Sequence, residues 1–480
     1  MEFSIQQSDC FKTGFFLQNK QKADYSPFQG NDELFLTQEG NASLKEEILK
    51  LIDQAERVIK VCSFIITDRE VFQVLLEKVK SRRIAVFVLT QLDPTKLKNT
   101  MAMANHVTDE ELSENPAHTH LYHIKALFDQ GAHVRAATTA HAKFLLIDRK
   151  MGLLMSANLT TPSLNLNTES GIYVDNDTVA ELDRLFDIIF QHGTRYRQYF
   201  TASKSKAFVV SNNEHVSTDY LLINPSGRLR YTYEQHTHHL YETMLEYVNQ
   251  ATEYVYISTY SIVGLEKLPA FTRAVEAAVS RGVSISIFCR GMNYRSDHLK
   301  NTLLLAQLGC KVYGDVYNHS KGIINENTGM IFTANIDGNH GLINGLEVGY
   351  VLNKVQRAAF LDFHLTLIGS SPYVFHTHPQ RAELFKTYGD YEVLKGLKPP
   401  VFPDELEIHG MKSIRLAEAD FKRHAIFYAR QQHNNFLVIG PALYRCQYQS
   451  GKFTILSREE FRTDLEKYIL KFNNLKITLN

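Results

Sequence analysis

The sequence contains an internal duplication, and this feature constrains the fold more than any other. A segment that begins at Leu44 (LKEEILKLIDQAERVIKVCSFIITD) is matched by one that begins at Leu240 (LYETMLEYVNQATEYVYISTYSIVG). In both segments apolar residues recur three and four positions apart, as on one face of a helix, before a β-rich run. Each copy therefore predicts an amphipathic helix followed by a strand.

The duplication continues along the chain, but the offset between the copies changes. A second predicted helix and strand meet at Ser81-Arg82 in the first copy and at Ser280-Arg281 in the second, 199 residues later. Further on, Gly131 and Gly309 align at an offset of 178. The first copy therefore holds about 21 extra residues, which we place near 92–120.

Strands that alternate with helices predict an α/β fold with mostly parallel sheets. Two copies in one chain predict two tandem repeats related by a pseudo-twofold axis. The C-terminal part differs, because short β-like runs (HAIFYAR, NNFLVIG, ALYRCQY, KFTILS) precede an amphipathic helix, EEFRTDLEKYILKF. We expect a small α+β appendage there. The predicted parts are an N-terminal extension, the first repeat, a linker, the second repeat and the appendage, at 1–40, 41–199, 200–238, 239–398 and 404–480.

The composition is that of a folded, cytoplasmic protein. The 480 residues exceed one ordinary core, and the 44% hydrophobic fraction excludes a disordered chain. No apolar run approaches the roughly 20 residues of a membrane span, and the N-terminus lacks the features of a secretory signal. Five cysteines without a C-x-x-C pair indicate reduced thiols, with Cys62 and Cys289 inside apolar runs. A net charge of zero excludes a strongly basic chain but leaves room for a local basic groove.

Each repeat ends in the same set of polar residues, HAKFLLIDRKMGLLMSANLT in the first and HSKGIINENTGMIFTANID in the second. A single H-x-K would arise by chance, but the whole string at the same place in both copies would not. The spacing of two puts each His and Lys on one face of a strand. The members are His141, Lys143, Asp148, Ser156, Asn158 and Glu169, and then His319, Lys321, Glu326, Thr333, Asn335 and Glu347.

This pattern resembles the phospholipase D superfamily, whose signature is H-x-K-x4-D followed by G/S-x-N. The resemblance covers roughly residues 40–370 and implies two α/β/α sandwich repeats whose motifs form one phosphodiester site. The sequence departs from the signature at Glu326, which replaces Asp, and at Thr333, which replaces Ser. The glycine before each hydroxyl is also replaced, by Met155 and by Phe332.

The resemblance also implies the roles of these residues. One imidazole attacks phosphorus to give a phosphohistidine, and the other protonates the leaving oxygen and then activates water. We expect His141 as the nucleophile and His319 as the acid/base, although the residues themselves leave the two roles open. Glu169 is expected to orient His141, and Glu347 to orient His319. The lysines and the asparagines Asn158 and Asn335 are expected to hold the phosphate oxygens, with Asp148, Glu326, Ser156 and Thr333 in support.

The scheme needs no metal and no cofactor, because lysines supply the positive charge that a divalent ion supplies elsewhere. Two further histidine groups were weighed as metal ligands, His236, His238 and His239 in one run and His376 with His378 in another. No Cys or Asp cluster accompanies them in the sequence, so polar linker histidines are the simpler interpretation.

Nucleic acid is the favoured substrate, because the motif context looks like that of superfamily members that cleave DNA. Cations expected at strand ends beside the site are Arg82, Arg83, Lys96, Lys98, Arg290, Arg295 and Lys300. A cardiolipin-synthase-like phospholipase or phosphatidyltransferase is the alternative, and a non-catalytic binding protein on the same fold is the second. The appendage at 404–480 could bind a protein partner, and the oligomeric state stays open.

Overall fold

The computed structural model describes residues 14–22, 28–91, 116–136, 140–192, 197–203, 206–211, 223–292, 296–379, 383, 387, 405–409, 426–431, 434–439, 442–449, 452–460, 470–471 and 476–479. The chain divides into two compact units. The repeat unit comprises Gln21–Gly291 and Gln307–Pro372, and the C-terminal unit comprises Met1–Lys20, Met292–Ala306 and Tyr373–Asn480. Most of the expected insertion at 92–120 lies outside the described residues, because the description resumes only at residue 116.

The first repeat is built on a mixed sheet. Its strand order is β10-β9-β5-β4-β3-β6-β7-β8-β2. Only the β3–β4 and β4–β5 pairs are parallel, whereas the neighbours from β3 through β6, β7 and β8 to β2 run antiparallel. The bounds are β2 Phe35–Thr37, β3 Val58–Cys62, β4 Ala85–Thr90, β5 His133–Ala136, β6 Phe144–Ile147, β7 Met151–Met155, β8 Glu169–Tyr173, β9 Arg197–Ser203 and β10 Lys206–Ser211.

Helices cover this sheet for reasons that are visible in the sequence. The helix α3 begins after Asp68, whose carboxylate accepts hydrogen bonds from the backbone N–H groups of Glu70 and Val71. Its apolar face is buried, as the three-and-four spacing predicts. The helices of this repeat are α2 Ser43–Asp53, α3 Arg69–Lys80, α5 Pro116–Asp129, α6 Thr161–Asn165 and α7 Asn176–His192.

The second repeat has the same plan. Its strands in the repeat unit follow the order β16-β15-β13-β17-β18-β20-β11-β12, which matches β5-β4-β3-β6-β7-β8-β2 position by position up to β11. The strands are β11 Leu229–Tyr233, β12 Thr237–His238, β13 Tyr254–Ser258, β15 Ser284–Arg290, β16 Lys311–Asp315, β17 Gly322–Asn325, β18 Gly329–Phe332 and β20 Leu346–Val351. A small pair, β14 Ile262–Val263 with β19 Ile336–Asp337, and the helices α8 His239–Gln250, η4 Leu265–Lys267, α9 Pro269–Ser280 and α11 Lys354–Ser370 complete it.

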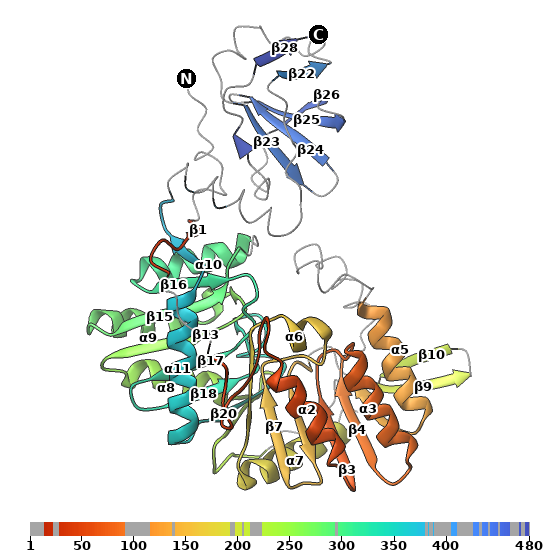
Figure 1. Cartoon of the computed structure of the whole chain (residues 1–480). Coiled ribbons are helices and arrows are strands. Elements are labelled where there is room, and N and C mark those ends of the chain that lie inside the picture. The colour runs from red at the N-terminus through yellow and green to blue at the C-terminus, as the bar shows by residue number, and fades with distance from the viewer. Residues whose placement is uncertain are drawn as a thin grey trace. The chain divides into compact units, whose positions relative to one another are not determined.

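The α/β fold is therefore confirmed, and the matching strand orders agree with the two tandem repeats, which lie side by side in Figure 1, red to yellow and green to cyan. The expectation of mostly parallel sheets is wrong. In the main sheets of the two repeats, parallel pairing is confined to strands joined by helices, whereas β6 and β7, like β17 and β18, are joined by tight turns that allow only antiparallel pairing.

One close approach recurs in both repeats. A Cβ atom added at Gly171 would lie 2.4 Å from Leu44 Cδ1, and one added at Gly349 would lie 2.4 Å from Leu240 Cδ2. Each glycine thus lets the first helix of its repeat pack directly on the strand that follows the motif. The two repeats also share one hydrophobic cluster, to which α7 contributes Phe186 and α11 contributes Phe363.

The C-terminal unit contains a seven-stranded sheet with the order β27-β23-β24-β25-β26-β22-β28. Its strands are β22 Glu405–His409, β23 Ile426–Gln431, β24 Asn434–Ile439, β25 Ala442–Gln449, β26 Lys452–Glu459, β27 Leu470–Lys471 and β28 Lys476–Leu479. The same unit holds the antiparallel pair of β1 Phe15–Gln18 with β21 Tyr373–His376, and most of α10 Ser296–Gln307. The prediction of a helix over EEFRTDLEKYILKF is wrong near both ends of that segment, because Glu459 belongs to β26 and Leu470–Lys471 forms β27. Residues 461–469 lie outside the described residues.

Two further expectations concern the described residues. Cys62 and Cys289 are fully buried free thiols, and burial raises the pKa of both. None of the helices in the described ranges is long and apolar enough to span a bilayer.

Candidate active site

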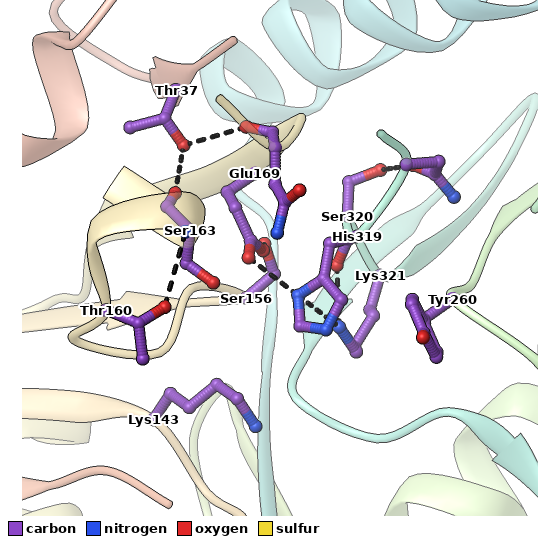
Figure 2. Close-up of polar contacts among 12 residues, drawn as sticks. Thr37, Lys143, Ser156, Thr160, Ser163, Glu169, Tyr260, His319, Ser320 and Lys321 are labelled. Atoms are coloured by element: carbon purple, nitrogen blue, oxygen red, sulfur yellow. Dashed lines mark hydrogen bonds and ion pairs between the residues drawn. The ribbon is translucent and has the colours of Figure 1, made fainter. Parts of the chain in front are cut away.

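The two motif histidines lie just before equivalent strands, β6 and β17, and come together in the repeat unit. Lys321 acts electrostatically on His141, and Lys143 acts on His319, so the two motifs share one site. Figure 2 shows His319 between Glu169 and Lys321, with Lys143 extending from the first repeat toward the same space. The structure thus brings together the histidines and lysines that the sequence singled out.

Each histidine is held by a carboxylate from the other repeat. His141 Nδ1 lies 2.6 Å from Glu347 Oε1, and His319 Nδ1 lies 2.6 Å from Glu169 Oε1. Both carboxylates are buried. An Nδ1–H that donates to a carboxylate fixes the ring tautomer and leaves the Nε2 lone pair for chemistry.

The expected pairs Glu169–His141 and Glu347–His319 are therefore wrong, and the backbone explains the exchange. Isolated parallel bridges join Thr168 to Asn318 and Ala140 to Leu346. The N–H of Thr168 donates to Tyr317 O, and that of His141 donates to Leu346 O. Each glutamate follows a bridge residue directly, so the bridge places it beside the histidine of the other repeat.

The two lysines are fully buried beside the histidine rings. Lys143 Nζ donates to the carbonyl oxygen of His141 at 2.5 Å, and Lys321 Nζ donates to that of His319 at 2.6 Å. Each ammonium also lies 3.2 Å from the Nδ1 of the same histidine. Two positive charges are thus held within the site by the strands themselves.

The hydroxyl groups of the motifs hold the glutamates from the other side. Ser156 Oγ donates to Glu169 Oε2 at 2.5 Å, and Thr333 Oγ1 donates to Glu347 Oε2. Thr333 thus performs the task of a serine, so the departure at this position conserves the contact. Each hydroxyl also accepts a backbone N–H from the neighbouring strand, that of Ser170 or Val348.

The motif asparagines lie beside these hydroxyls. Among the described residues, Asn158 Oδ1 and Asn335 Oδ1 are buried and accept no hydrogen bond. A buried amide oxygen without a partner is unfavourable, and its retention at both equivalent positions is typical of a functional constraint. The amide nitrogens of these side chains are the groups that could donate to a bound anion.

The two motif acids, Asp148 and Glu326, have a structural task. Asp148 accepts from the backbone N–H groups of Glu56, Arg57 and Val58 at 2.8–2.9 Å. Glu326 accepts from the N–H and the hydroxyl of Thr252, the residue equivalent to Glu56. The longer Glu side chain therefore reaches the same turn, and both acids fix the turn before the central strand of their repeat.

Burial dominates the electrostatics of the histidines. Burial lowers the pKa of His141 to about 4, although Glu347 raises it, and the neighbouring lysines lower it further. The pKa of His319 is lowered to about 4 for the same reasons, with Glu169 as the opposing group. The free site therefore holds neutral imidazoles at pH 7, and binding of an anion would favour their protonation.

The lysines and glutamates respond to the same burial. Burial lowers the pKa of Lys143 to about 8 against the attraction of Glu347 and Glu169. Burial alone would raise the pKa of each glutamate, but the paired histidine and the nearby lysine outweigh it and hold both carboxyl pKa values below their usual range. The glutamates are thus ionised at neutral pH.

Sequence reasoning missed two aromatic residues that flank the histidines. Phe64 packs edge-on against His141, with ring centroids 5.2 Å apart, and Tyr260 packs in the same way against His319 at 4.9 Å. These positions are 196 residues apart, the offset of the first helix pair, which was the signal available in the sequence.

The residues behind the aromatic rings differ between the repeats. Arg290 Nη1 donates to the Tyr260 hydroxyl at 3.0 Å, and its guanidinium lies 5.2 Å from the ring centroid. The equivalent residue of the first repeat is Gln91. The backbone N–H of Gln91 donates to Phe64 O, as the backbone N–H of Arg290 donates to Tyr260 O. The His319 side therefore carries a buried cation that the His141 side lacks at this position.

A cavity of about 170 Å³ opens on the His141 side. Most of its wall comes from the segment 335–345, which follows the second motif. The lining residues are Phe64, His141, Asn335, Asp337, His340, Gly341, Asn344, Gly345 and Glu347.

Arg82 and Arg83, two of the cations expected beside the site, are not gathered there. Arg82 and Arg83 precede β4, whose six residues span about 20 Å, and the site lies at the opposite end of that strand. The prediction for Arg82 and Arg83 was wrong because, in the sequence, a polar loop before a strand looks the same as a polar loop after it. Lys300 belongs to the C-terminal unit, and Lys96, Lys98 and Arg295 lie outside the described residues.

The further histidine groups serve local contacts. His238 Nε2 lies 3.1 Å from Ile343 O, and His378 Nδ1 lies 3.0 Å from the hydroxyl of Thr377. Within the described ranges, no three His, Cys, Asp or Glu side chains are grouped as a metal site requires.

Comparison with known proteins gives a family match and fold likenesses. Residues 48–190 match a family model described as "Cardiolipin synthase, PLD-like domain". No curated protein matches the sequence significantly.

Solved structures with some likeness are polyphosphate kinase from Porphyromonas gingivalis (15% identity, 69% of this chain and 49% of that chain, TM-score 0.44) and phosphatidylserine synthase from Haemophilus influenzae (12%, 81% and 97%, 0.48). A third is Nuc, a phospholipase D family member from Salmonella typhimurium (14%, 35% and 98%, 0.28). This chain spans about half of the length of the polyphosphate kinase. The family model covers the first motif through Glu169, and the second repeat carries the same motif. Residues 48–190 thus match a phospholipase D-like domain, as the motifs predict.

Proposed function

We propose that the protein is a metal-independent phosphodiesterase that forms a phosphohistidine intermediate and acts on nucleic acid. The match of residues 48–190 to a phospholipase D-like domain supports phosphodiester chemistry in general. The observation that carries the proposal is the reciprocal pair of imidazole–carboxylate contacts, each 2.6 Å long, with a buried lysine beside each ring.

The proposed reaction has two steps. In the first, the Nε2 lone pair of one histidine forms a bond to phosphorus while the phosphorus–oxygen bond to the leaving group breaks. The other histidine gives its Nε2 proton to the leaving oxygen. In the second step this histidine takes a proton from water, whose oxygen bonds to phosphorus while the phosphorus–nitrogen bond breaks.

The neighbouring groups would stabilise the transition state. Lys143 and Lys321 are fixed in a buried site, where charge interactions are strong. Together with the amide nitrogens of Asn158 and Asn335, they would bind the non-bridging phosphate oxygens as negative charge builds up. Glu169 and Glu347 would stabilise the imidazolium that forms on the ring each one holds.

Two substrate classes need to be separated. Nucleic acid is supported by the sequence around the motifs and by the buried cation Arg290, which lies against Tyr260, the ring that packs on His319. A phosphatidyltransferase or phospholipase is the second candidate, favoured by the description of the family model that matches residues 48–190.

A substrate panel tests the proposal. Purified full-length protein would be incubated with bis(p-nitrophenyl) phosphate, labelled single- and double-stranded DNA and RNA, and phospholipid vesicles that contain phosphatidylglycerol. We expect turnover of the generic diester and of a nucleic acid. His141→Gln and His319→Gln should each lose turnover while circular dichroism stays unchanged. Transfer or hydrolysis of lipid alone would establish the second candidate, and wild-type protein that binds these ligands without turnover would indicate a non-catalytic binding protein.

A further inference from the structure

The two sides of the site differ in how far they are open. The His141 side chain is 27% exposed and lines the cavity of about 170 Å³, whereas the His319 side chain is 11% exposed. The sequence motifs are nearly identical, so this difference arises from the segments around them.

The segment that leads to Glu169 is tied down on the His319 side. It contains α6, and the hydroxyl of Thr37 donates to Ser163 O at 2.7 Å and to Asn167 O at 3.2 Å. Thr160 caps this helix, accepting from the N–H of Ser163. Figure 2 shows Thr37, Ser163 and Thr160 as this tied layer beside Glu169 and His319.

The equivalent segment on the His141 side forms no α-helix, and the cavity beside His141 remains open next to it. It runs through β19 and a series of turns that contain Gly338, Gly341 and Gly345. The segment is fixed rather than loose, because Ile336 N donates to Thr259 Oγ1 and Gly338 N donates to Val263 O. The opening beside His141 is therefore built into the fold.

In-line substitution at phosphorus links this opening to the roles of the histidines. The leaving group departs opposite the attacking nitrogen, and the water of the second step enters from that same side. The leaving group and the water must therefore move past the histidine that acts as acid and base, whereas neither has to move past the nucleophile. The open side of the site therefore suits the acid/base.

The charge difference agrees with the difference in exposure. Phosphorylation of a histidine adds a negatively charged group, which a nearby buried cation stabilises. Arg290 supplies such a cation behind Tyr260 on the His319 side, where it also attracts the carboxyl group of Asp315, and neutral Gln91 takes its place on the His141 side.

From these two differences we propose that His319 is the nucleophile and His141 the acid/base, and that the cavity beside His141 receives the leaving and entering groups. This inference rests on the proposed function and reverses the assignment that the family resemblance favours. His319 Nε2 bonds to phosphorus as the leaving oxygen departs with the His141 proton. Water that enters through the cavity then gives a proton to His141, and its oxygen bonds to phosphorus while the bond to His319 Nε2 breaks.

An activated leaving group separates the two roles. The p-nitrophenolate ion leaves without protonation, so His141→Gln should still release one equivalent of p-nitrophenol from bis(p-nitrophenyl) phosphate and then stop. The adduct should appear in the intact mass and map to the peptide with His319 under alkaline conditions, since phosphohistidine is acid-labile. His319→Gln should give neither a burst nor an adduct.

A second variant tests the role of the cation. Arg290→Gln, which copies the first repeat, should slow the burst at least tenfold in the His141→Gln background. Arg273→Gln on α9, the same change at an exposed arginine, should leave it unchanged. An adduct on His141 in the His319→Gln protein, or no burst in a folded His141→Gln protein, would overturn the assignment although the wild-type enzyme is active. Absence of any wild-type turnover would instead remove the proposed function itself.

Discussion

Replacement of Glu347 by Gln tests whether the second repeat holds the histidine of the first. The contact between Glu347 and His141 Nδ1 is 2.6 Å long and buried. Glutamine keeps the shape and an oxygen acceptor but removes the charge. With about 4 Å between the centres of charge and an effective dielectric constant of about 20, the lost attraction for imidazolium is about 4 kcal/mol. Because the remaining hydrogen bond recovers part of this, we expect kcat/KM to fall roughly 10²- to 10³-fold.

Steady-state hydrolysis of bis(p-nitrophenyl) phosphate measures this loss, and histidine ¹⁵N NMR identifies the ring affected. The Nδ1–H signal of His141, assigned by its absence in His141→Gln, should move in Glu347→Gln and stay in place in Glu169→Gln. Glu326→Gln, the same change at an acid that binds the turn near Thr252, serves as the control and should retain the wild-type rate.

Two results would refute this reasoning. If the His141 signal moved in Glu169→Gln and not in Glu347→Gln, each repeat would hold its own histidine. If Glu347→Gln retained the wild-type kcat/KM, the carboxylate would have no electrostatic part in the reaction, however its contact is arranged.

The remaining predictions concern pH, stability and metal ions. Activity should decline as the pH rises past about 8, because the Lys143 ammonium then loses its proton. The pKa of Lys143 in the folded protein is about 8, below its ordinary value of 10.5, so the unfolded chain binds more protons between these values and stability should rise with pH there, by roughly 3 kcal/mol in total. Urea unfolding of wild-type protein and Lys143→Met across this range checks the slope, which the variant should lack. Asp148→Asn should cost about 1–3 kcal/mol, since at least one of the turn N–H groups loses its acceptor, and unfolding curves that match the wild type would contradict the capping role. Turnover of bis(p-nitrophenyl) phosphate should persist in EDTA, and loss of activity that added Mg²⁺ or Zn²⁺ restores would exclude the metal-free mechanism.

The duplication made the fold predictable, because two copies of the same helix–strand pattern are expected to fold with the same topology. It also singled out the candidate site residues, since each motif member recurs at its equivalent position. The direction of strand pairing could not be predicted as well, because helical crossovers and tight turns both join apolar runs of similar length.

The exchanged Glu–His pairs could not be predicted from spacing. Glu169 and Glu347 each follow their own histidine by 28 residues, so pairing within a repeat and pairing between repeats fit the sequence equally. The deciding contacts are the backbone bridges of Thr168 with Asn318 and of Ala140 with Leu346, which join residues without distinctive side chains. The opening beside His141 was hidden for a related reason, because it depends on how the segment 335–345 turns.

The bridges between the repeats also bear on how such a chain can change over generations. Because each half depends on the other for the partner of its histidine, neither copy is free to decay while the other keeps the activity. A substitution that removes Glu169 disables the ring of the other copy while its own histidine keeps its partner. Gene duplication usually leaves one copy free to diverge, but here it would have created mutual dependence. Divergence is then confined to the segments around the motifs, where the two halves already differ.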